Sequence, residues 1–459
     1  MATQFAKPGE RVTRAALSSQ LDLSGYTRKI STQRYHCPDY NTRERANLWM
    51  RVWQIAGRAE DIPEAGDWME FRLFDQSYVL VRGRDGTIRG FVNACRHRGN
   101  AFCEGRGNAP RFTCPYHNWS YGLDGQCLSV ARPDFDGTIE EFVGAAKEEL
   151  GLIAVSVECF AGFIFLNPDP DAAPLADFLG DARDMLEPYR IDEMVALGMN
   201  VRETIECNWK VVMDAFQEGY HVQGVHPELA HMTNLGAEHC VITGEHAVTC
   251  VPFAASNQAG LGLEDEIAGY LGLPVENFPG FAEALPRFAE IVAGYRRSDG
   301  LLDLPEGVTP IGMLQQAVRD RLTAKGLDVS GLTDDQMSDY HYWFLFPNVF
   351  MQVRFGDGTA IIAEPHPSGD PNRCRWRAIA LMWLPPEERE AQRTPLTEIA
   401  EDDHFPYFLA LQQDFDQMAI QQRGLRNRQM THQRLTIQEP KIHHFHSRVD
   451  HWVDGGTGR

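Results

Sequence analysis

Two short stretches, Cys95-Arg-His97 and Cys114-Pro-Tyr-His117, decide how the rest of this chain is interpreted. Sixteen residues separate them, and each stretch offers one thiol and one imidazole. A structural zinc finger usually presents its two cysteines together and then its two histidines. Here the order is Cys-His and then Cys-His, which indicates two equivalent loops that each supply one ligand of either kind.

Such a pair of loops can bind a [2Fe-2S] cluster, with the thiolates on one iron and the imidazoles on the other. Neutral imidazoles reduce the negative charge around the cluster, which raises its potential to roughly −150 to +300 mV. A zinc site or unrelated loop residues are the alternatives. The predicted cluster ligands are Cys95, His97, Cys114 and His117.

The region around these loops predicts a small all-β domain, from 47 to 166. Tyr78–Arg82 and Thr87–Val92 flank Asp85-Gly86, which is typical of a β-hairpin, and Tyr121 to Leu128 repeats the pattern. After a Pro-rich linker, residues 167–459 predict a catalytic domain of mixed helix and sheet. Residues 1–46 are expected to form an N-terminal segment that packs on the catalytic domain.

Composition narrows the class of protein. The chain has 459 residues, and 43 Lys+Arg against 64 Asp+Glu give a net charge of −21. Nucleic-acid binding needs clustered basic residues, so this class is not expected. The sequence contains no run of 18 apolar residues and no secretory signal pattern at its start. We therefore expect a cytoplasmic protein, with its ten cysteines mostly free thiols.

A second group of possible metal ligands follows Asn208-Trp-Lys210. His221 and His226 are five residues apart, which on an unbroken helix would turn the rings about 140° away from each other. Gly224 and Pro227 indicate a helical break that would bring His226 back toward the same ion. Asp214, Glu218 and His221 would lie along one helical stripe, with Glu218 hydrogen-bonded to a histidine ring.

Two imidazoles and one carboxylate leave open positions on a non-haem Fe(II) for oxygen and substrate. Asp214 is the local candidate for the carboxylate, and Asp414 or Asp416 on a predicted helix over Asp403–Arg423 are the distant ones. Asp414 and Asp416 differ by about 200° around a helix, so at most one of them faces the metal. Asp414 shares a face with Met418, which favours Asp414.

Three other interpretations stay open. Glu218-x-x-His221 and Glu401-x-x-His404 match the pattern of a di-iron carboxylate bundle, although Pro406 and the β domain fit it poorly. His221 and His226 could also be ordinary core histidines. His443, His444 and His446 are interpreted as structural or incidental.

Candidates for an apolar substrate pocket are Phe216, Val222, Trp343, Phe346, Phe350 and Gln352.

The cluster motif, with Arg98-Gly99 and the run from Trp119 to Gly125, closely resembles the Rieske motif, although Asn118 replaces the usual glycine. Both groups in this order resemble the large (alpha) subunit of Rieske non-haem iron ring-hydroxylating oxygenases. The resemblance implies an α+β fold: a small all-β Rieske domain and a larger catalytic domain with a central antiparallel sheet flanked by helices, of the helix-grip or START-like kind. It implies a [2Fe-2S] cluster and an Fe(II) held by His221, His226 and Asp414, with O2 as co-substrate.

The resemblance also implies an activity and partners. The expected activity is mono- or dioxygenation of an organic, aromatic or cyclic substrate. Glu218 stands where the family usually has an aspartate that bridges to the cluster histidine of a neighbouring subunit, which here would be His117. In having glutamate at this position, the chain resembles members that act on quaternary amines such as betaine or carnitine. Oxygenation of a quaternary amine is therefore an alternative activity. An electron carrier without catalysis is the non-enzyme alternative. Expected partners are a reductase or ferredoxin, further copies in a homotrimer, and a small beta subunit.

Overall fold

The computed structural model describes residues 28–228, 239–253, 262–273, 279–354 and 356–456. The chain divides into two compact units that are interleaved in sequence. The first, which we call the β unit, comprises 38–178, 365–370 and 451–459. The second, which we call the mixed unit, comprises 1–37, 179–364 and 371–450.

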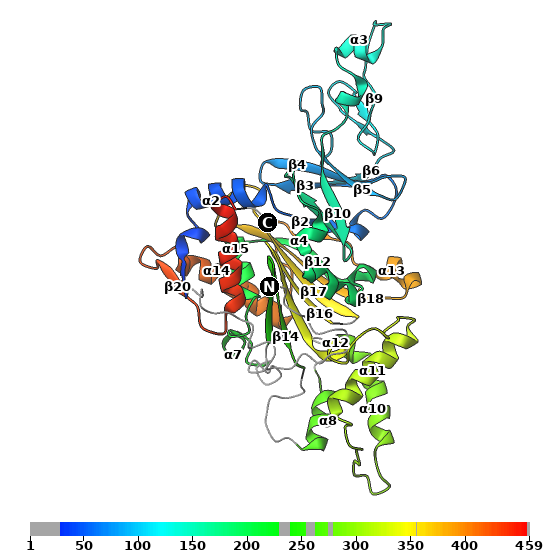
Figure 1. The fold of residues 1–459 in the computed structure, drawn as a ribbon, viewed down its shortest axis with the longest axis vertical. Coiled ribbons are helices and arrows are strands. Elements are labelled where there is room, and N and C mark those ends of the chain that lie inside the picture. The colour runs from blue at the N-terminus through cyan, green and yellow to red at the C-terminus, as the bar shows by residue number, and fades with distance from the viewer. Residues whose placement is uncertain (1–27, 229–238, 254–261, 274–278, 355, 457–459) are drawn as a thin grey trace. The chain divides into compact units, whose positions relative to one another are not determined.

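The β unit is built from two sheets (Figure 1). The larger has the strand order β2-β11-β10-β5-β4-β3-β6, and the smaller the order β7-β8-β9. Bounds are β2 Gln54–Arg58, β3 Asp67–Leu73, β4 Gln76–Arg82, β5 Ile88–Val92, β6 Arg106–Asn108, β7 Phe112–Thr113, β8 Ser120–Tyr121, β9 Cys127–Ser129, β10 Ala154–Phe160 and β11 Phe163–Asn167. The unit also has short helical elements: α2 Pro38–Glu44, η3 Arg45–Trp49, η4 Ala59–Asp61, α3 Ile139–Val143, η5 Lys147–Leu150 and α4 Leu175–Leu179.

Both predicted hairpins are present. The turn between β4 and β5 closes through Gly83, whose backbone N donates to the carbonyl of Thr87. Gly86 occupies the left-handed region at φ +79°, where glycine is favoured. Strands β8 and β9 pair across the second turn. The Cys95 loop follows β5, and the Cys114 loop connects the paired strands β7 and β8.

The mixed unit centres on a sheet with the order β13-β14-β15-β16-β17-β18-β12-β19. Pairing is antiparallel from β13 to β17 and between β18 and β12, while β19 joins β12 in parallel. Bounds are β12 Met194–Ile205, β13 His239–Thr243, β14 His246–Val251, β15 Tyr340–Leu345, β16 Val349–Arg354, β17 Asp357–Pro365, β18 Cys374–Trp383 and β19 Thr397–Glu398. A separate pair joins β1 Lys29–Ser31 to β20 His432–Arg434.

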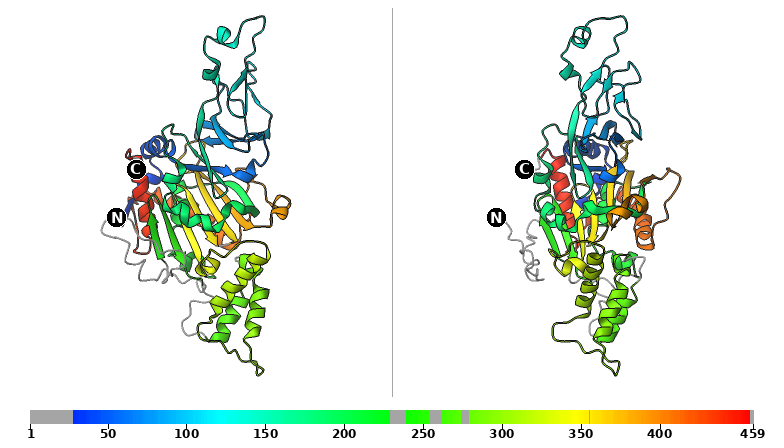
Figure 2. Two further views of the ribbon diagram at one scale, coloured as in Figure 1. Left: turned by 45° about the vertical axis from the view of Figure 1, so that its right-hand side comes forward. Right: turned by 90° about the vertical axis from the view of Figure 1, so that its right-hand side faces the viewer.

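Helices pack against this sheet through aromatic contacts. Phe445 lies 5.4 Å from Phe344 and 5.5 Å from Trp209, and Phe415 lies 5.4 Å from Trp376 (ring centroids). Helices α8, α10 and α11 form a separate group, drawn in green to yellow-green in Figure 2. Bounds are η2 Thr32–Tyr35, α5 Asp181–Leu186, η6 Glu187–Tyr189, η7 Ile191–Glu193, α6 Trp209–Ala215, α7 Val222–Val225, α8 Leu263–Leu271, α9 Pro279–Ala282, α10 Leu285–Gly294, α11 Pro310–Ala324, α12 Asp335–Ser338, α13 Pro386–Gln392, α14 Leu409–Leu425 and α15 Pro440–Val453.

The predicted fold class is confirmed: an all-β domain accompanies a larger unit with an antiparallel sheet and helices. The units differ in detail from the predicted ranges 1–46, 47–166 and 167–459. Residues 28–37 belong to the mixed unit and 38–46 to the β unit, and residues 1–27 lie outside the described part. Within the described residues, no helix combines the length and apolarity that a membrane span requires.

Candidate metal centres

The two cysteine–histidine loops have the same backbone hydrogen bonds. In the first, Cys95 N donates to the carbonyl of Asn100, and Gly99 N donates to the carbonyl of Cys95. In the second, Cys114 N donates to the carbonyl of Trp119, and Asn118 N donates to the carbonyl of Cys114. Both loops therefore turn through a left-handed residue four positions after the cysteine.

That left-handed position explains the departure at Asn118. Gly99 has φ +75° and Asn118 has φ +56°. Asparagine is one of the few residues with a side chain that enter this region readily. Asn118 therefore keeps the loop geometry that a glycine would give, and the ligand positions beside it are preserved.

The loops bring together the four predicted cluster ligands, which come from one unit. The Nδ1 atoms of His97 and His117 lie 3.1 Å apart, so both rings point the same nitrogen at one place. The His97 ring stacks on Trp119 at 5.0 Å, which fixes its orientation. Cys95 and Cys114 are buried. The Tyr121 hydroxyl lies 3.1 Å from Cys95 Sγ and accepts a hydrogen bond from Arg96 N at 3.1 Å.

The electrostatics of these groups fit a metal cluster. Burial raises the pKa of the Cys95 thiol, and Cys114 raises it further because two thiolates would repel each other. Burial and the neighbouring His117 lower the pKa of His97, which favours the neutral imidazole that a metal needs. Bound iron would supply the positive charge that two buried thiolates require.

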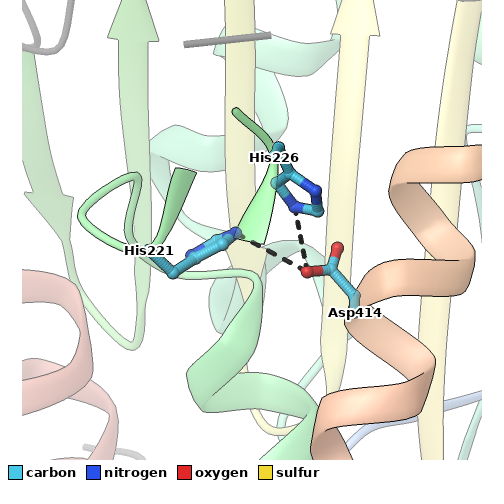
Figure 3. Close-up of side chains that lie close together, drawn as sticks. All are labelled: His221, His226 and Asp414. Carbon is cyan, nitrogen blue, oxygen red and sulfur yellow. Dashed lines mark hydrogen bonds and ion pairs between the residues drawn. The ribbon is translucent and has the colours of Figure 1, made fainter. Parts of the chain in front are cut away.

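Three side chains of the mixed unit form the second candidate site: His221, His226 and Asp414 (Figure 3). One possible ligand atom from each lies within 4.8 Å of the others. Asp414 Oδ1 is 3.1 Å from His226 Nε2 and 3.6 Å from His221 Nε2. Figure 3 shows the rings reaching from the chain around α7 toward the carboxylate on α14. Neighbouring ligands of one ion, each about 2.1 Å from it, lie about 3 Å apart, so this spacing suits a shared metal.

The outer nitrogens of both rings have partners that fix the rings. His221 Nδ1 donates to Glu218 Oε1 at 2.8 Å, and His221 N donates to Glu218 Oε2 at 3.0 Å. His226 Nδ1 donates to Gln413 Oε1 at 2.7 Å. In the structure His226 Nε2 lies within hydrogen-bond distance of Asp414 Oδ1, at 3.1 Å. A metal would displace the proton from this position, and with Nδ1 still protonated on each ring both Nε2 atoms would be available to it. The predicted contact between Glu218 and a histidine ring is thus present. The sequence pattern does not predict the matching contact of Gln413, whose one signal is that it precedes Asp414.

The same partners set the protonation of the rings. Burial lowers the pKa of His221, but the hydrogen bond and charge of Glu218, together with Asp414, outweigh it and raise the pKa. For His226, hydrogen bonds to Asp414 and Gln413 likewise outweigh burial. Protons therefore compete with a metal for these nitrogens, and metal binding should weaken as the pH falls.

A cavity of about 200 Å³ adjoins this trio. Its sheet wall includes a row of paired residues across four strands: Thr249, Tyr342, Gln352 and Thr359. Of the six predicted pocket candidates, Phe216, Val222, Phe350 and Gln352 line it, whereas Trp343 and Phe346 are buried elsewhere among the described residues.

The structure differs from the prediction along the segment that carries the histidines. Helix α6 ends at Ala215, so Asp214, Glu218 and His221 do not share a helical stripe. One break lies between Ala215 and Val222. Gly224 is inside α7, but this short helix ends at Val225 and His226 has a non-helical backbone directly before Pro227, so the predicted break at that end is present. Phe216 leaves the helix and stacks on Phe350 at 5.0 Å, a tertiary contact that outweighs local helix propensity.

Two of the predicted carboxylates lie outside the trio. Asp214 accepts from the Tyr35 hydroxyl at 2.5 Å and from His446 Nε2 at 2.9 Å, and it does not line the cavity. Asp416 is exposed and accepts from Gln412 Nε2 at 2.9 Å. The structure therefore brings Asp414, and not Asp214 or Asp416, to the two histidines.

The di-iron alternative has no support in this geometry. His404 Nδ1 bonds to Glu203 at 2.7 Å and its Nε2 bonds to Gln412 at 2.9 Å, so the ring belongs to a separate polar group. Among the described residues, three or more possible metal-binding side chains come together in one place, at His221, His226 and Asp414.

Comparison with known proteins identifies the family. A model described as the Ring hydroxylating alpha subunit (catalytic domain) matches residues 187–455, more than half of the chain. The chain belongs to this family. A model of the Rieske [2Fe-2S] domain matches residues 52–140, which include both cysteine–histidine loops. The β unit is therefore a Rieske domain, and the two matches together imply the [2Fe-2S] cluster and the mononuclear iron for which the four loop ligands and the trio are suited.

Curated relatives in this family have different substrates. The oxygenase subunit of glycine betaine monooxygenase from Chromohalobacter salexigens is 35% identical over 200 residues, 42% of each protein. Biphenyl 2,3-dioxygenase subunit alpha from Rhodococcus jostii is 35% identical over 185 residues, 39% of each. The carnitine monooxygenase oxygenase subunit of Escherichia coli is 33% identical over 186 residues, 40% of this chain and 48% of that protein. Each of these alignments spans less than half of the relative.

Solved structures resemble most of the chain in fold. A quaternary ammonium Rieske monooxygenase matches with a TM-score of 0.62 and 17% identity, covering 93% of this chain and 95% of the other. Naphthalene 1,2-dioxygenase with bound indole matches with a TM-score of 0.64 and 20% identity, covering 93% of each chain. At these identities the likeness concerns the fold.

Proposed function

We propose that this alpha subunit is the terminal oxygenase component of a Rieske oxygenase, which hydroxylates an organic substrate with O2. The observation that carries the proposal is the trio of His221, His226 and Asp414 at the wall of a cavity, in a chain that also carries a Rieske domain. When bound, the cluster supplies single electrons and the mononuclear iron supplies a centre for O2 activation.

The side chains have distinct tasks in this proposal. Cys95, His97, Cys114 and His117 would hold the cluster, and His221, His226 and Asp414, which line the cavity, would hold the iron. Glu218 and Gln413 keep the histidines in the tautomer that binds metal. Phe216, Phe350 and other apolar residues of the cavity bind the body of the substrate and exclude water.

Counting iron and acid-labile sulfide tests this proposal against a simple electron carrier. We expect three iron atoms and two sulfides per chain, and a loss of one iron in His221→Ala with the cluster spectrum retained. Two iron atoms per chain in the wild type would contradict the oxygenase. Substrate-dependent O2 consumption with a surrogate reductase, over a panel of aromatic compounds and quaternary amines, then tests the reaction itself.

Oxidative demethylation or hydroxylation of a quaternary amine is the second candidate. The matches to glycine betaine and carnitine monooxygenase subunits favour it, as does the glutamate at position 218. A tertiary amine released from betaine or carnitine would select this candidate, with formaldehyde beside it if an N-methyl group is oxidised, whereas a diol from an aromatic compound would select the first.

We also propose partners for the oxygenase. Electrons come from a separate reductase or ferredoxin, and a ring of three chains pairs the cluster of one subunit with the iron of the next, with Glu218 bridging to His117 of the neighbour. A small beta subunit is compatible with this arrangement. Separated monomers should lose coupled turnover while keeping the cluster absorption, and fully active monomers would contradict the ring.

A further inference from the structure

The sheet wall of the cavity beside the metal trio carries a continuous polar row. We call the polar row Thr249, Tyr342, Gln352 and Thr359, which are directly paired across β14, β15, β16 and β17 and all line the cavity. Directly paired residues project from the same face of a sheet. Three strand spacings make the row about 14 Å long. The polar groups therefore form an extended surface along the wall and not a single contact.

Three members of the polar row have hydrogen-bonding groups that the protein does not use. Thr249 is 6% exposed, and Gln352 and Thr359 are partly buried. Within the part of the chain that the structure describes, none of these three side chains makes a hydrogen bond. Polar groups inside proteins are normally hydrogen-bonded, so groups left over at a cavity wall are available to a ligand or to water.

A further polar side chain of the cavity lies outside this row. Gln217 is 1% exposed, and neither its amide nitrogen nor its amide oxygen has a hydrogen-bond partner among the described residues. Leaving a buried amide unpaired is unfavourable, so an ordered water or a ligand that enters the cavity and bonds to it would be stabilised. The cavity thus offers unused donors and acceptors from the sheet and from the segment before His221.

The neighbouring row of the same wall is apolar. Phe350 and Ile361 are directly paired and line the cavity. Each lies two positions along its strand from a member of the polar row, and alternate residues of a strand share a face. Phe216 stacks on Phe350 with the ring centroids 5.0 Å apart. The wall therefore places an aromatic surface beside a row of neutral amide and hydroxyl groups.

We infer that the substrate is an aromatic or cyclic compound that already carries a neutral oxygen substituent, a hydroxyl or a carbonyl. Its ring lies against Phe216 and Phe350, and its oxygen accepts hydrogen bonds from the Gln352 amide and the Thr359 hydroxyl. A hydrocarbon of the same shape would displace water from these groups without replacing its hydrogen bonds, so the site selects against it. This inference rests on the proposed function, because it names the substrate class of the same cavity.

The test compares compounds in which a carbon group of similar size replaces the oxygen. The pairs are 1-naphthol with 1-methylnaphthalene, and acetophenone with α-methylstyrene, so that one pair reports on a hydroxyl and the other on a carbonyl. Binding is measured on the full-length, metal-loaded protein without a reductase, by equilibrium dialysis in sealed cells. We expect the oxygen compound of at least one pair to bind about tenfold or more tightly than its hydrocarbon partner.

Variants assign this preference to the polar row. Gln352→Met keeps an unbranched side chain of similar length without the amide, and Thr359→Val keeps the shape without the hydroxyl. We expect Gln352→Met to remove most of the preference and Thr359→Val to lower it about threefold. Gln392→Met, on α13 and outside the cavity, is the matched control and should retain it.

The outcomes separate this inference from the proposed function. Hydrocarbons that bind as tightly as their oxygen partners, a preference unchanged in a folded Gln352→Met protein, or no saturable binding of either oxygen compound at millimolar concentration would each overturn the inference. If Gln352→Met does not fold, Thr359→Val decides, and an unchanged preference there overturns it. Binding that depends on Gln352 without O2 consumption would leave the inference standing and refute the oxygenase. Turnover of naphthalene with O2, at a rate that Gln352→Met does not change, would do the reverse.

Discussion

Removing the carboxylate of Glu218 should weaken iron binding without touching the iron. Glu218 is nearly buried, with 9% of its side chain exposed, and both of its oxygens are used: one accepts from His221 Nδ1 at 2.8 Å and the other from His221 N at 3.0 Å. In Glu218→Ala the imidazole loses the partner that fixes both its tautomer and its rotation. Outer partners of metal ligands typically contribute 10–100-fold to affinity, which corresponds to about 1.4–2.7 kcal/mol.

Glu218→Gln should have a smaller effect. Its amide oxygen can still accept from His221 Nδ1, but a neutral acceptor makes a hydrogen bond about half as strong as a charged one. We therefore expect a loss of roughly 3–10-fold for the glutamine variant, between the wild type and Glu218→Ala.

The assay is anaerobic competition between the protein and a chelator for Fe(II), at a pH well above the range where His221 titrates. Glu218 raises the pKa of His221, so at lower pH its removal would also weaken the competition of protons with the metal. At a pH where His221 carries no extra proton in any variant, this opposing effect is absent. The cluster absorption monitors the Rieske domain, and Asp416→Asn, an exposed carboxylate on α14, is the matched control. Unchanged Fe(II) affinity in Glu218→Ala would refute the assignment of Glu218 as the residue that positions His221.

Three further predictions follow from the same geometry. Asp414→Ala should lose the mononuclear iron while Asp416→Ala keeps it, as measured by metal analysis; iron lost only in Asp416→Ala would reverse the assignment. Tyr121→Phe removes a hydrogen bond to Cys95 Sγ. Because that hydrogen bond stabilises the more negative, reduced cluster, its loss should lower the midpoint potential by on the order of 60 mV in a spectroscopic titration. An unchanged potential would contradict this role of Tyr121. Burial lowers the pKa of His444 to about 4 from 6.5. Below about pH 6.5 the unfolded chain takes up a proton at this histidine while the folded protein does not. The free energy of unfolding should therefore fall by about 3 kcal/mol between pH 6.5 and pH 4. His444→Gln should therefore flatten the dependence of the urea midpoint on pH over that window, and an equally steep wild-type and variant profile would refute it.

The cluster loops could be predicted from the sequence because their geometry is local. Each loop is determined by a cysteine, a left-handed residue four positions later and a hairpin beside it, all within a few residues. The same holds for the relation between Asp414 and Met418, which share a buried helical face as expected. In both cases the spacing along the chain fixes the spacing in space.

Helices between β14 and β15 were harder to predict, although signals were present. The sequence from 254 to 334 is irregular and does not indicate its secondary structure, whereas the structure describes α8 to α11 there. Thr309 caps α11 by accepting from Gly312 N, and Pro310 occupies the first helical turn, a combination that marks a helix start. Irregular segments around these helices obscured the pattern, and part of the region lies outside the described residues.

Asp214 shows most clearly what local spacing leaves undetermined. It lies seven residues before His221, closer in sequence than Asp414, and could have been the third ligand. Its carboxylate, 5% exposed, is instead held by Tyr35 and His446, which are 179 and 232 positions away. These partners satisfy both oxygens, and Arg34 in turn donates to His446 Nδ1 at 2.9 Å. With Asp214 fixed by the two ends of the mixed unit, the carboxylate for the histidines has to come from α14, so the complete trio exists only once these distant segments have folded together.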